Sequence, residues 1–319
     1  MSLPINFLES THRVRINAPA KINLHLEVLG LRADGFHELA MVMQSIDLAD
    51  QLAITRNNDG LISLTVDDSS LSTGDENLII KAAQLLRCRY GNDEHGAIIH
   101  LQKNIPIGAG LAGGSSDGAA TLLGLNSLWE LSLTKRQLVN LATELGSDIP
   151  FCLDGGIQLC FGRGEKLEPV KALNSAKAVI LVKDPTVSVS TPWAYGRSKK
   201  MKGNSYLKSE SDFELRRQQL REQSWLCSSR YSDKPLLKND LQQIVAPEFP
   251  AVQKSLKILS ELPGSVGFAM SGSGPSCFAL YSTYEEAKAV LEKNRMRLEA
   301  SGLDSWCCSF QFEGVNFEA

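Results

Sequence analysis

A short stretch rich in glycine and serine carries the clearest chemistry in this sequence. Residues 106–121 read Pro-Ile-Gly-Ala-Gly-Leu-Ala-Gly-Gly-Ser-Ser-Asp-Gly-Ala-Ala-Thr, with five glycines and two serines directly ahead of a helix-forming segment. Glycine lets the backbone turn through positive φ and approach a ligand without a Cβ in the way. A helix starting near Ser115 leaves its first amides unpaired and carries partial positive charge at that end. These features predict a cradle for phosphate, and therefore a bound nucleotide.

Three better-known motifs fit this loop only in part. Residues 108–113 satisfy G-x-G-x-x-G, but the acidic residue expected about 20 positions on would be Glu130, which ends the same predicted helix. Residues 114–118 satisfy the G-x-S-x-G of hydrolases, yet every histidine precedes Ser116, whereas in that fold the histidine follows the serine. No Gly-Lys-Ser/Thr closes the loop as a Walker motif requires. A glycine-serine phosphate cradle of another design remains.

A second group that could do chemistry is Asp148. Apolar residues within 138–145 mark one face of a helix, and Gly146 is a natural residue just past its end. Because Ile149 precedes Pro150, it is pushed to extended geometry, so Asp148 lies in a short, stiff connection. A carboxylate there is ionised at pH 7 and can orient a hydroxyl and accept its proton late.

The elements that must position these groups follow from periodicity. Ile22 to Val28 alternate with polar neighbours, which predicts a half-buried strand with Lys21 on its solvated face. An earlier strand through residues 14–16 should stop at Pro19. Further strands are expected at residues 42–48, 51–55, 61–66 and 97–101, and helices at 77–90, 115–129 and 138–145.

The second half predicts strands at 178–183, 266–270, 276–281 and 306–312 and a helix at 285–300, a β-α-β-β-α-β order typical of ferredoxin-like folds. Residues 197–235 interrupt this order as an insertion, with a helix predicted at 213–226. Its basic residues are interpreted as a solvated surface excursion, although they could also meet a polyanion. They are Arg197, Lys199, Lys200, Lys202 and Lys208.

Composition bounds the function classes. The chain has 319 residues, 43% apolar and 22% charged, as in a soluble globular protein of one large or two ordinary domains. A net charge of −3 gives no whole-molecule field for nucleic acid or an anionic membrane. No run approaches the roughly 18 apolar residues of a membrane span, and the start lacks a signal-like pattern, so a cytoplasmic location is expected. Seven cysteines without a C-x-x-C pair predict neither a disulfide framework nor a metal–thiolate site.

The loop also resembles a known family. Residues 106–117 are similar to the phosphate-binding motif of the GHMP small-molecule kinases, Ala18 to Leu24 to their first motif, and Met270 to Cys277 to their third. Three further segments resemble, within that superfamily, the diphosphocytidyl-methylerythritol kinases, which use ATP to phosphorylate the 2-hydroxyl of their isoprenoid-pathway substrate. These are residues 32–37, 146–150 and 185–192.

The resemblance implies a two-domain α+β GHMP kinase fold. Residues 1–170 would form a ribosomal-S5-domain-2-like, ATP-binding and catalytic domain. Residues 171–319 would form a ferredoxin-like substrate domain with the insertion near 197–235. It implies ATP and Mg²⁺ as cofactors, cytidine diphosphate methylerythritol as the small-molecule substrate, no nucleic-acid or membrane partner, and a monomer or weak homodimer.

The resemblance also implies roles for single residues. Lys21 and Asp148 match the catalytic pair. The nucleotide-binding residues would be Pro106, Gly108, Gly110, Leu111, Ala112, Gly113, Gly114, Ser115 and Ser116. The substrate-binding residues would be Asn23, Phe36, His37, Tyr195 and Ser273. Of these, His37 would read the cytosine edge, while Phe36 and Tyr195 would enclose the ring. No residue is assigned as a metal ligand, so magnesium would rest on ATP oxygens, water and serine hydroxyls.

Two positions depart from the family pattern, and three rival functions stay open. Phe36 stands where tyrosine is expected, and Gly118 where alanine is usual. The rivals are a GHMP kinase for homoserine or mevalonate, a non-catalytic nucleotide sensor on a kinase fold, and a binding module that uses the basic insertion. The cytosine-binding set argues against the first rival, and the intact pair of Lys21 and Asp148 against the second.

Overall fold

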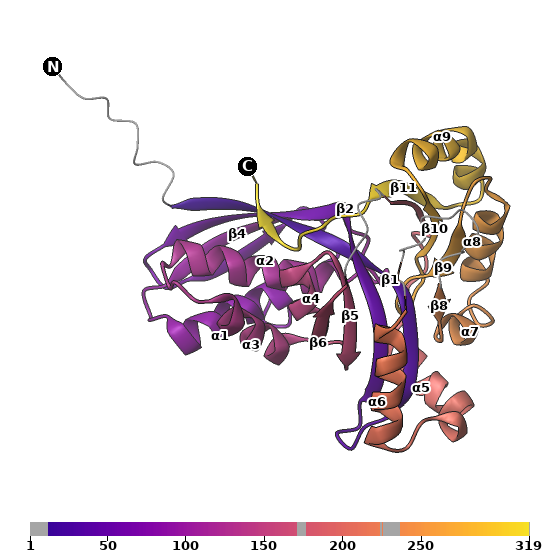
Figure 1. The fold of residues 1–319 in the computed structure, drawn as a ribbon. Coiled ribbons are helices and arrows are strands. Elements are labelled where there is room, and N and C mark those ends of the chain that lie inside the picture. The colour runs from indigo at the N-terminus through magenta and orange to yellow at the C-terminus, as the bar shows by residue number, and fades with distance from the viewer. Residues whose placement is uncertain (1–11, 171–176, 224, 226–236, 319) are drawn as a thin grey trace.

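The computed structural model describes residues 12–170, 177–223, 225 and 237–318, and its strands form two separate sheets (Figure 1). One sheet is built mainly from the first half of the chain and the other from the second half. No helix within these ranges is both long enough and apolar enough to cross a membrane.

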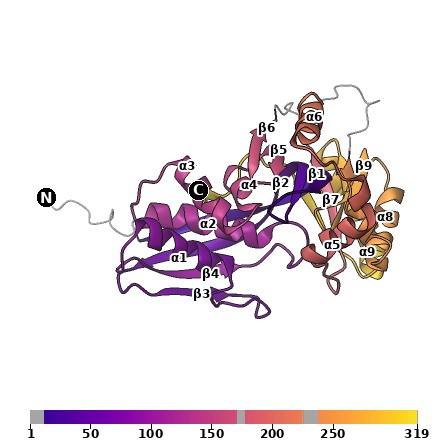
Figure 2. The ribbon, with the colours of Figure 1, turned by 90° about the horizontal axis from the view of Figure 1, so that it is seen from below.

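The first sheet has the path β12-β1-β2-β4-β3, with β5 also pairing β2 and β6, and β8 pairing β1. Its strands are β1 (Arg13–Leu31), β2 (His37–Asn57), β3 (Ile62–Val66), β4 (Gly96–Gln102), β5 (Ile157–Gly162), β6 (Lys166–Pro169), β8 (Lys238–Asn239) and β12 (Asn316–Phe317). The helices of this half are α1 (Leu78–Tyr90), α2 (Gly113–Leu128), α3 (Lys135–Leu145) and α4 (Ile149–Asp154), and they lie together on one side of the sheet (Figure 2).

The second sheet is antiparallel in the order β11-β7-β10-β9. Its strands are β7 (Ala178–Lys183), β9 (Gly267–Met270), β10 (Cys277–Tyr281) and β11 (Asp304–Ser309). The helices of this half are α5 (Thr191–Lys202), α6 (Glu210–Arg221), α7 (Gln242–Val245), α8 (Pro250–Glu261) and α9 (Tyr284–Ala300), with the short 3-10 turn η1 (Gly203–Ser205) after α5. Two short strands of the second half, β8 and β12, pair with β1 and so tie the halves together.

The prediction for the first strand was wrong in two respects. β1 does not stop at Pro19, because its pairing with β2 shifts register between Pro19 and Lys21, and a bulge tolerates a residue that cannot donate to the ladder. Nor is the polar face of the strand solvated. Lys21, Asn23, His25 and Glu27 are all buried, since elements of the second half cover them.

Most other predicted elements are present with shifted bounds. The pieces expected at 42–48 and 51–55 belong to one long strand, β2, in which the buried carboxylate of Asp50 accepts the N–H groups of Asn104 and Ile105. The predicted helix at 115–129 begins two residues earlier and ends one earlier as α2, and the last predicted strand at 306–312 is β11 at 304–309.

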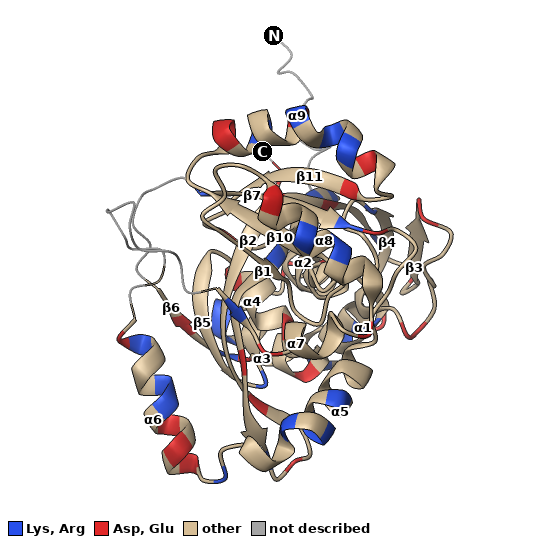
Figure 3. Cartoon of the chain, turned by 90° about the vertical axis from the view of Figure 1, so that its right-hand side faces the viewer, with Lys and Arg blue, Asp and Glu red and all other residues tan. Residues whose placement is uncertain are grey.

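The insertion was predicted least well. Its helix is α6 at 210–221 rather than 213–226, and residues 224 and 226–236 lie outside the described part. Acidic and basic residues are interleaved along α6 (Figure 3). The basic residues named for this segment are exposed or half-buried, as interpreted, but Arg217 on α6 is only 5% exposed, so the segment is not a solvated excursion throughout.

Adjacent residues of β4 provide a matched test of the core. Ile99 is fully buried against the helices, whereas the side chain of Ile98 on the opposite face is 51% exposed. Because a cavity forms only at the buried site, we expect Ile99→Ala to lower the free energy of unfolding by about 2–5 kcal/mol. Ile98→Ala should cost less than about 1 kcal/mol. Urea unfolding followed by circular dichroism measures both, and equal losses would contradict this core.

Candidate functional site

A cavity of about 920 Å³ lies where the two halves of the chain meet. Its walls come from the glycine-rich loop, the second half of β1, the start of β2, the start of α5 and the turn after β9. Of the predicted site residues, those lining the cavity are Lys21, Asn23, Phe36, His37, Pro106, Gly108, Gly110, Leu111, Ala112, Gly113, Gly114, Ser115, Asp148, Tyr195 and Ser273.

The glycine-rich loop takes a left-handed path into α2. Gly108, Gly110 and also Ala112 have positive φ, at 61°, 74° and 59°. Ala112 is the N-cap and has no side chain that could satisfy the first amides of the helix, so these N–H groups point to the cavity end without an intrahelical acceptor. At Gly110 a Cβ would lie 2.5 Å from the carbonyl oxygen of Ser271, so only glycine fits this close approach. The loop is built to present amides to an anion.

Ser116 is the one predicted nucleotide-binding residue that does not line the cavity. It is fully buried, its hydroxyl donates to the carbonyl of Pro19 over 2.8 Å, and its N–H donates to the carbonyl of Ala112. Both of its donors are therefore engaged inside the protein, which contradicts the expectation that its hydroxyl reaches a phosphate or metal. Ser115, one residue earlier, is half-buried and faces the cavity.

Lys21 joins three parts of the site. Its ammonium donates to Oδ1 of Asn23 at 2.7 Å and to the carbonyl of Gly110 at 3.2 Å, and lies 3.6 Å from Oδ2 of Asp148. The backbone N–H of Lys21 also donates to the carbonyl of Leu111 at 3.0 Å. The lysine thus links β1 to the glycine-rich loop and to the predicted proton acceptor.

Asp148 lies between α3 and α4, in the short connection predicted for it. The expectation of extended geometry at Ile149 was wrong: Ile149 begins α4, with Pro150 in the first turn, where a proline is tolerated. It is the N-cap residue of α4, but its carboxylate makes no capping hydrogen bond and is 31% exposed toward the cavity. Pro150 at the start of α4 fixes the local path. The carboxylate is therefore held beside Lys21 and remains accessible to a ligand.

The turn after β9 closes the cavity from the second half. Oγ of Ser271 donates to the carbonyl of Gly110 at 3.2 Å and accepts the N–H of Asn23 at 3.2 Å. The side chain of Asn239 donates to the carbonyls of Met270 and Gly272, at 2.7 and 2.9 Å, and holds the turn in place. Ser273 and Thr191 share a hydrogen bond of 2.8 Å at the cavity wall.

The other end of the cavity is aromatic. The ring of His37 stacks on Tyr195 at 5.2 Å and meets Tyr206 edge-on at 5.7 Å. The side chain of Phe36 is 55% exposed, with the Arg163 guanidinium 5.0 Å above its ring. Phe36 and Tyr195 both line the cavity, but in this structure the face of Tyr195 is covered by His37. Within the described residues, the buried Nε2 of His37 has no hydrogen-bond partner.

The pKa values of His37 and of Asp117 on α2 depend on neighbouring residues that were not predicted from the sequence. Burial, and then the positive charge of Lys199, lower the pKa of His37. At the other end, Oδ2 of Asp117 accepts a hydrogen bond from Lys103 at 3.0 Å, and Lys103 also pairs with Asp50. Burial raises the pKa of Asp117 despite the neighbouring lysine.

Some of these residues had a signal in the sequence and others had none. Thr191 lies inside the segment 185–192 that resembled the family, and Lys199 lies in the basic run. Arg163 and Lys103 stand in no motif, and only the folded chain brings them to the cavity.

Comparison with known proteins gives the family. The model of the GHMP kinases N terminal domain matches residues 77–156, and that of the GHMP kinases C terminal matches residues 213–299. A 4-diphosphocytidyl-2-C-methyl-D-erythritol kinase of Prochlorococcus marinus is 63% identical over 319 residues, with both chains covered completely. One of Synechococcus sp. is 58% identical over 306 residues, covering 96% of this chain and 100% of the relative.

Solved structures agree with these relatives. A crystal structure of a 4-(cytidine 5'-diphospho)-2C-methyl-D-erythritol kinase superposes with a TM-score of 0.70 at 30% identity, covering 93% of this chain and 98% of that chain. Homoserine kinase from Cytophaga hutchinsonii superposes with a TM-score of 0.68 at 18% identity, covering 99% and 100% of the two chains, which is a likeness of fold alone.

The electrostatics at His37 can be tested directly. Lys199→Met removes a positive charge that lowers the pKa of His37, so we expect that pKa to rise, while burial keeps acting to lower it. Because the folded state holds His37 with a lowered pKa, the unfolded chain protonates first as pH falls. His37 therefore costs stability below about pH 6.5, and less so in the variant.

An NMR titration of the His37 imidazole measures this change. Lys200→Met is the matched control, since Lys200 is the next exposed residue of α5 and is not among the groups that shift His37. A His37 midpoint unmoved by Lys199→Met would contradict the assignment.

Proposed function

The chain belongs to the 4-diphosphocytidyl-2-C-methyl-D-erythritol kinases of the GHMP kinase family, and we propose that its central cavity is where this phosphoryl transfer takes place. The enzyme is a small-molecule kinase that transfers the γ-phosphoryl group of ATP to the 2-hydroxyl of 4-diphosphocytidyl-2-C-methyl-D-erythritol. The observation that carries the placement is that the glycine-rich loop, Asp148 and the aromatic end line one cavity.

The nucleotide phosphates fit the loop. Unpaired amides at the start of α2, the left-handed turn at Ala112 and the close approach at Gly110 all favour an anion at this point. We assign the phosphates to the amides of residues 110–115 and the hydroxyl of Ser115, and leave Ser116 out because its donors are engaged elsewhere.

Magnesium fits this site only as a partner of the phosphates. Among the described residues, no group of three or more His, Cys, Asp or Glu side chains could hold a metal ion. Mg²⁺ commonly keeps several waters and takes one or two protein oxygens besides the phosphates. The hydroxyl of Ser115 is a cavity oxygen suited to that role. When bound, the ion would offset negative charge on the phosphates.

Lys21 and Asp148 then act on the acceptor alcohol. Kinases of this kind mainly position the reactants and stabilise charge that spreads over the phosphoryl oxygens. We propose that the Asp148 carboxylate accepts a hydrogen bond from the 2-hydroxyl, aims its oxygen at the phosphorus and takes the proton late in the transfer. Lys21, 3.6 Å from that carboxylate, would hold its orientation and place positive charge near the transferred group.

The cytosine is assigned to the aromatic end of the cavity. The free Nε2 of His37 is a suitable partner for the base edge, and the exposed ring of Phe36 offers a stacking face. Because His37 covers Tyr195, the base would either stack between Phe36 and the histidine or displace the histidine from the tyrosine. Asn23 and Ser273 lie between the two ends and are assigned to the substrate.

We also propose which fold types the two domains adopt. The order β11-β7-β10-β9, with helices between the first and second and between the third and fourth strands in the chain, supports a ferredoxin-like second domain. We retain the division at residue 170, with an S5-like first domain. We further propose that the enzyme acts in the cytoplasm as a monomer or weak homodimer.

The role of Asp148 predicts a loss of turnover without a loss of nucleotide binding. Asp148→Asn keeps the shape of the side chain but removes the proton acceptor, so kcat should fall by roughly 10²–10⁴-fold. ADP release with the cytidylated substrate measures kcat, and calorimetry with ATP should give an unchanged affinity.

Asp154→Asn is the matched control, because Asp154 ends the same helix and pairs with Lys135. It should retain wild-type turnover. A normal kcat for Asp148→Asn would rule out Asp148 as the proton acceptor.

We expect the adjacent serines to have different roles, Ser115 in binding ATP and Ser116 in stabilising the fold. Ser115→Ala removes a cavity hydroxyl, so the KM for ATP should rise several-fold with little change in unfolding. Ser116→Ala removes a buried hydrogen bond to the carbonyl of Pro19, so the free energy of unfolding should fall by about 1–3 kcal/mol with the KM for ATP unchanged. The opposite pattern in kinetics and urea unfolding would show that Ser116, not Ser115, faces the nucleotide.

A further inference from the structure

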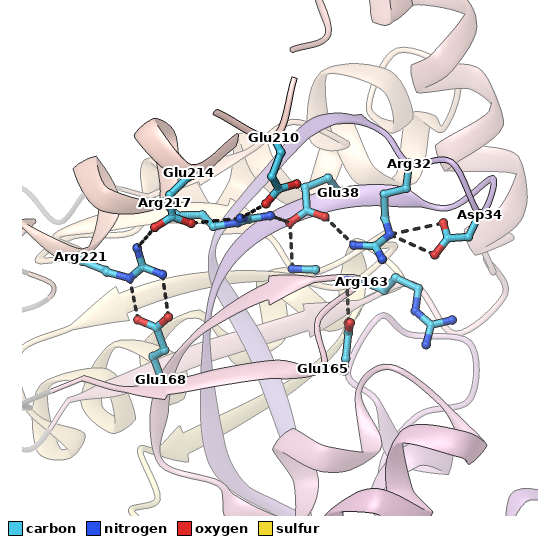
Figure 4. Close-up of polar contacts among 11 residues, drawn as sticks. Arg32, Asp34, Glu38, Arg163, Glu165, Glu168, Glu210, Glu214, Arg217 and Arg221 are labelled. Carbon is cyan, nitrogen blue, oxygen red and sulfur yellow. Dashed lines mark hydrogen bonds and ion pairs between the residues drawn. The ribbon is translucent and has the colours of Figure 1, made fainter. Parts of the chain in front are cut away.

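Three arginines of α6 bind carboxylates on three different strands of the first sheet. Arg216 makes paired hydrogen bonds to Glu27 of β1, at 2.8 and 3.0 Å, and Arg221 makes paired bonds to Glu168 of β6, both at 2.8 Å. Arg217 donates from Nη2 to Glu38 of β2 at 2.5 Å (Figure 4). The insertion helix is therefore fastened to the sheet by charge-assisted hydrogen bonds, the stronger kind.

The pair of Arg217 and Glu38 stands apart because it is buried and adjoins the aromatic end of the cavity. Glu38 is 1% exposed and directly follows His37. Its carboxylate also accepts Nη1 of Arg32 at 2.6 Å and the N–H of Gly162 at 3.1 Å. Burial raises the pKa of Glu38, but the two arginines outweigh this and lower it below its ordinary value, so the group is a carboxylate.

Through Arg32 the same carboxylate reaches the turn that carries Phe36. Nε of Arg32 donates to both carboxylate oxygens of Asp34, at 3.1 and 3.3 Å, and Asp34 accepts the N–H of Phe36 at 3.1 Å. A continuous chain of polar contacts thus runs from Arg217 through Glu38 and Arg32 to Asp34 (Figure 4), and Asp34 accepts the N–H of Phe36. His37 is joined to this chain only as the neighbour of Phe36 and Glu38 in the sequence. In Figure 1 the end of β1 and the start of β2 extend beyond the rest of the sheet and lie beside α6. The helix is therefore placed to support this end of the two strands.

Close packing fixes the distance between α6 and the end of β1. A Cβ on Gly30 of β1 would lie 2.5 Å from the carbonyl oxygen of Leu207 and 2.8 Å from the ring of Phe213. The N–H of Leu207 donates to the carbonyl of Leu29 at 2.8 Å. The segment leading into α6 is therefore in direct backbone contact with the hairpin, and a shift of one moves the other.

We propose that Arg217, acting through Glu38, is a positioning residue for the cytosine-binding end of the site, so that the insertion helix sets where Phe36 and His37 lie. This inference rests on the proposed function. It gives the insertion a role in recognising the cytidine diphosphate part of the substrate, and none in binding ATP.

The test separates this role from simple stabilisation of the fold. Arg217→Gln removes the charge that orients Glu38, so we expect the affinity for cytidine diphosphate and the KM for the cytidylated substrate to worsen about tenfold, or about 1.4 kcal/mol. The KM for ATP and kcat at saturation should stay within about twofold, because neither the glycine-rich loop nor Asp148 contacts this cluster. Arg217→Lys, which keeps the charge, should recover part of the affinity.

Arg221→Gln is the matched control on the same helix. Its guanidinium binds Glu168 and Glu214 and does not touch Glu38, so cytidine diphosphate should bind as in the wild type. Glu38→Gln should worsen the affinity at least as much as Arg217→Gln, because it also weakens the pair with Arg32. Adding Arg217→Gln to Glu38→Gln should cause little further loss, because the pair of Arg217 and Glu38 is already removed. Glu38→Gln also keeps the test available if Arg217→Gln does not fold.

The results of these experiments distinguish a failure of the proposed function from a failure of the positioning role. If calorimetry shows that wild-type enzyme does not bind cytidine diphosphate, the proposed function fails and this inference fails with it. If the wild type binds and Arg217→Gln and Glu38→Gln bind equally well, the proposed function stands and the positioning role is overturned. Equal worsening of both KM values would likewise overturn it, since that is what general damage to the fold produces.

Discussion

The buried ammonium group of Lys21 is the interaction on which the rest of the site depends. It reaches Asn23, the carbonyl of Gly110 and the carboxylate of Asp148 at once, from one strand to the loop and to the connection before α4. A buried charge is costly unless it is paired and hydrogen-bonded, so these three partners are held at fixed positions around it. The proposed proton acceptor and phosphate loop are thereby fixed relative to each other before any ligand arrives.

The second half of the chain also covers the polar face of β1, on which Lys21 lies. Ser271 bonds to Asn23, and Arg216 and Lys238 bond to Glu27. The second half thereby satisfies the backbone N–H of Asn23 and the carboxylate of Glu27. The side chains of Lys21 and Asn23 instead bond to groups of the first half, and among the described residues the ring nitrogens of His25 have no hydrogen-bond partner. The cavity and the docking of the two halves both depend on this interface, so damage to it should affect both.

Local signals in the sequence were enough for the parts of the site that depend on local geometry. The glycines near α2 permit a left-handed path wherever they occur, and the loop was predicted from them. The short connection at Asp148 was also predicted, but the extended geometry expected at Ile149 was not found, because Pro150 lies in the first turn of α4. The burial of Lys21, the inward hydroxyl of Ser116 and the ion pairs of Arg217 could not be predicted, because alternation or a basic run looks the same whether water or another element covers it. These features depend on contacts between residues far apart in the chain, such as Arg217 and Glu38.

The most direct test of the account is a crystal structure with a non-hydrolysable ATP analogue and the cytidylated substrate bound together. We expect the triphosphate on the amides of residues 110–115, the cytosine beside His37, and the acceptor hydroxyl within hydrogen-bond distance of Asp148 and in line with the γ-phosphorus. A triphosphate bound away from the start of α2, or an acceptor hydroxyl out of reach of Asp148, would contradict it.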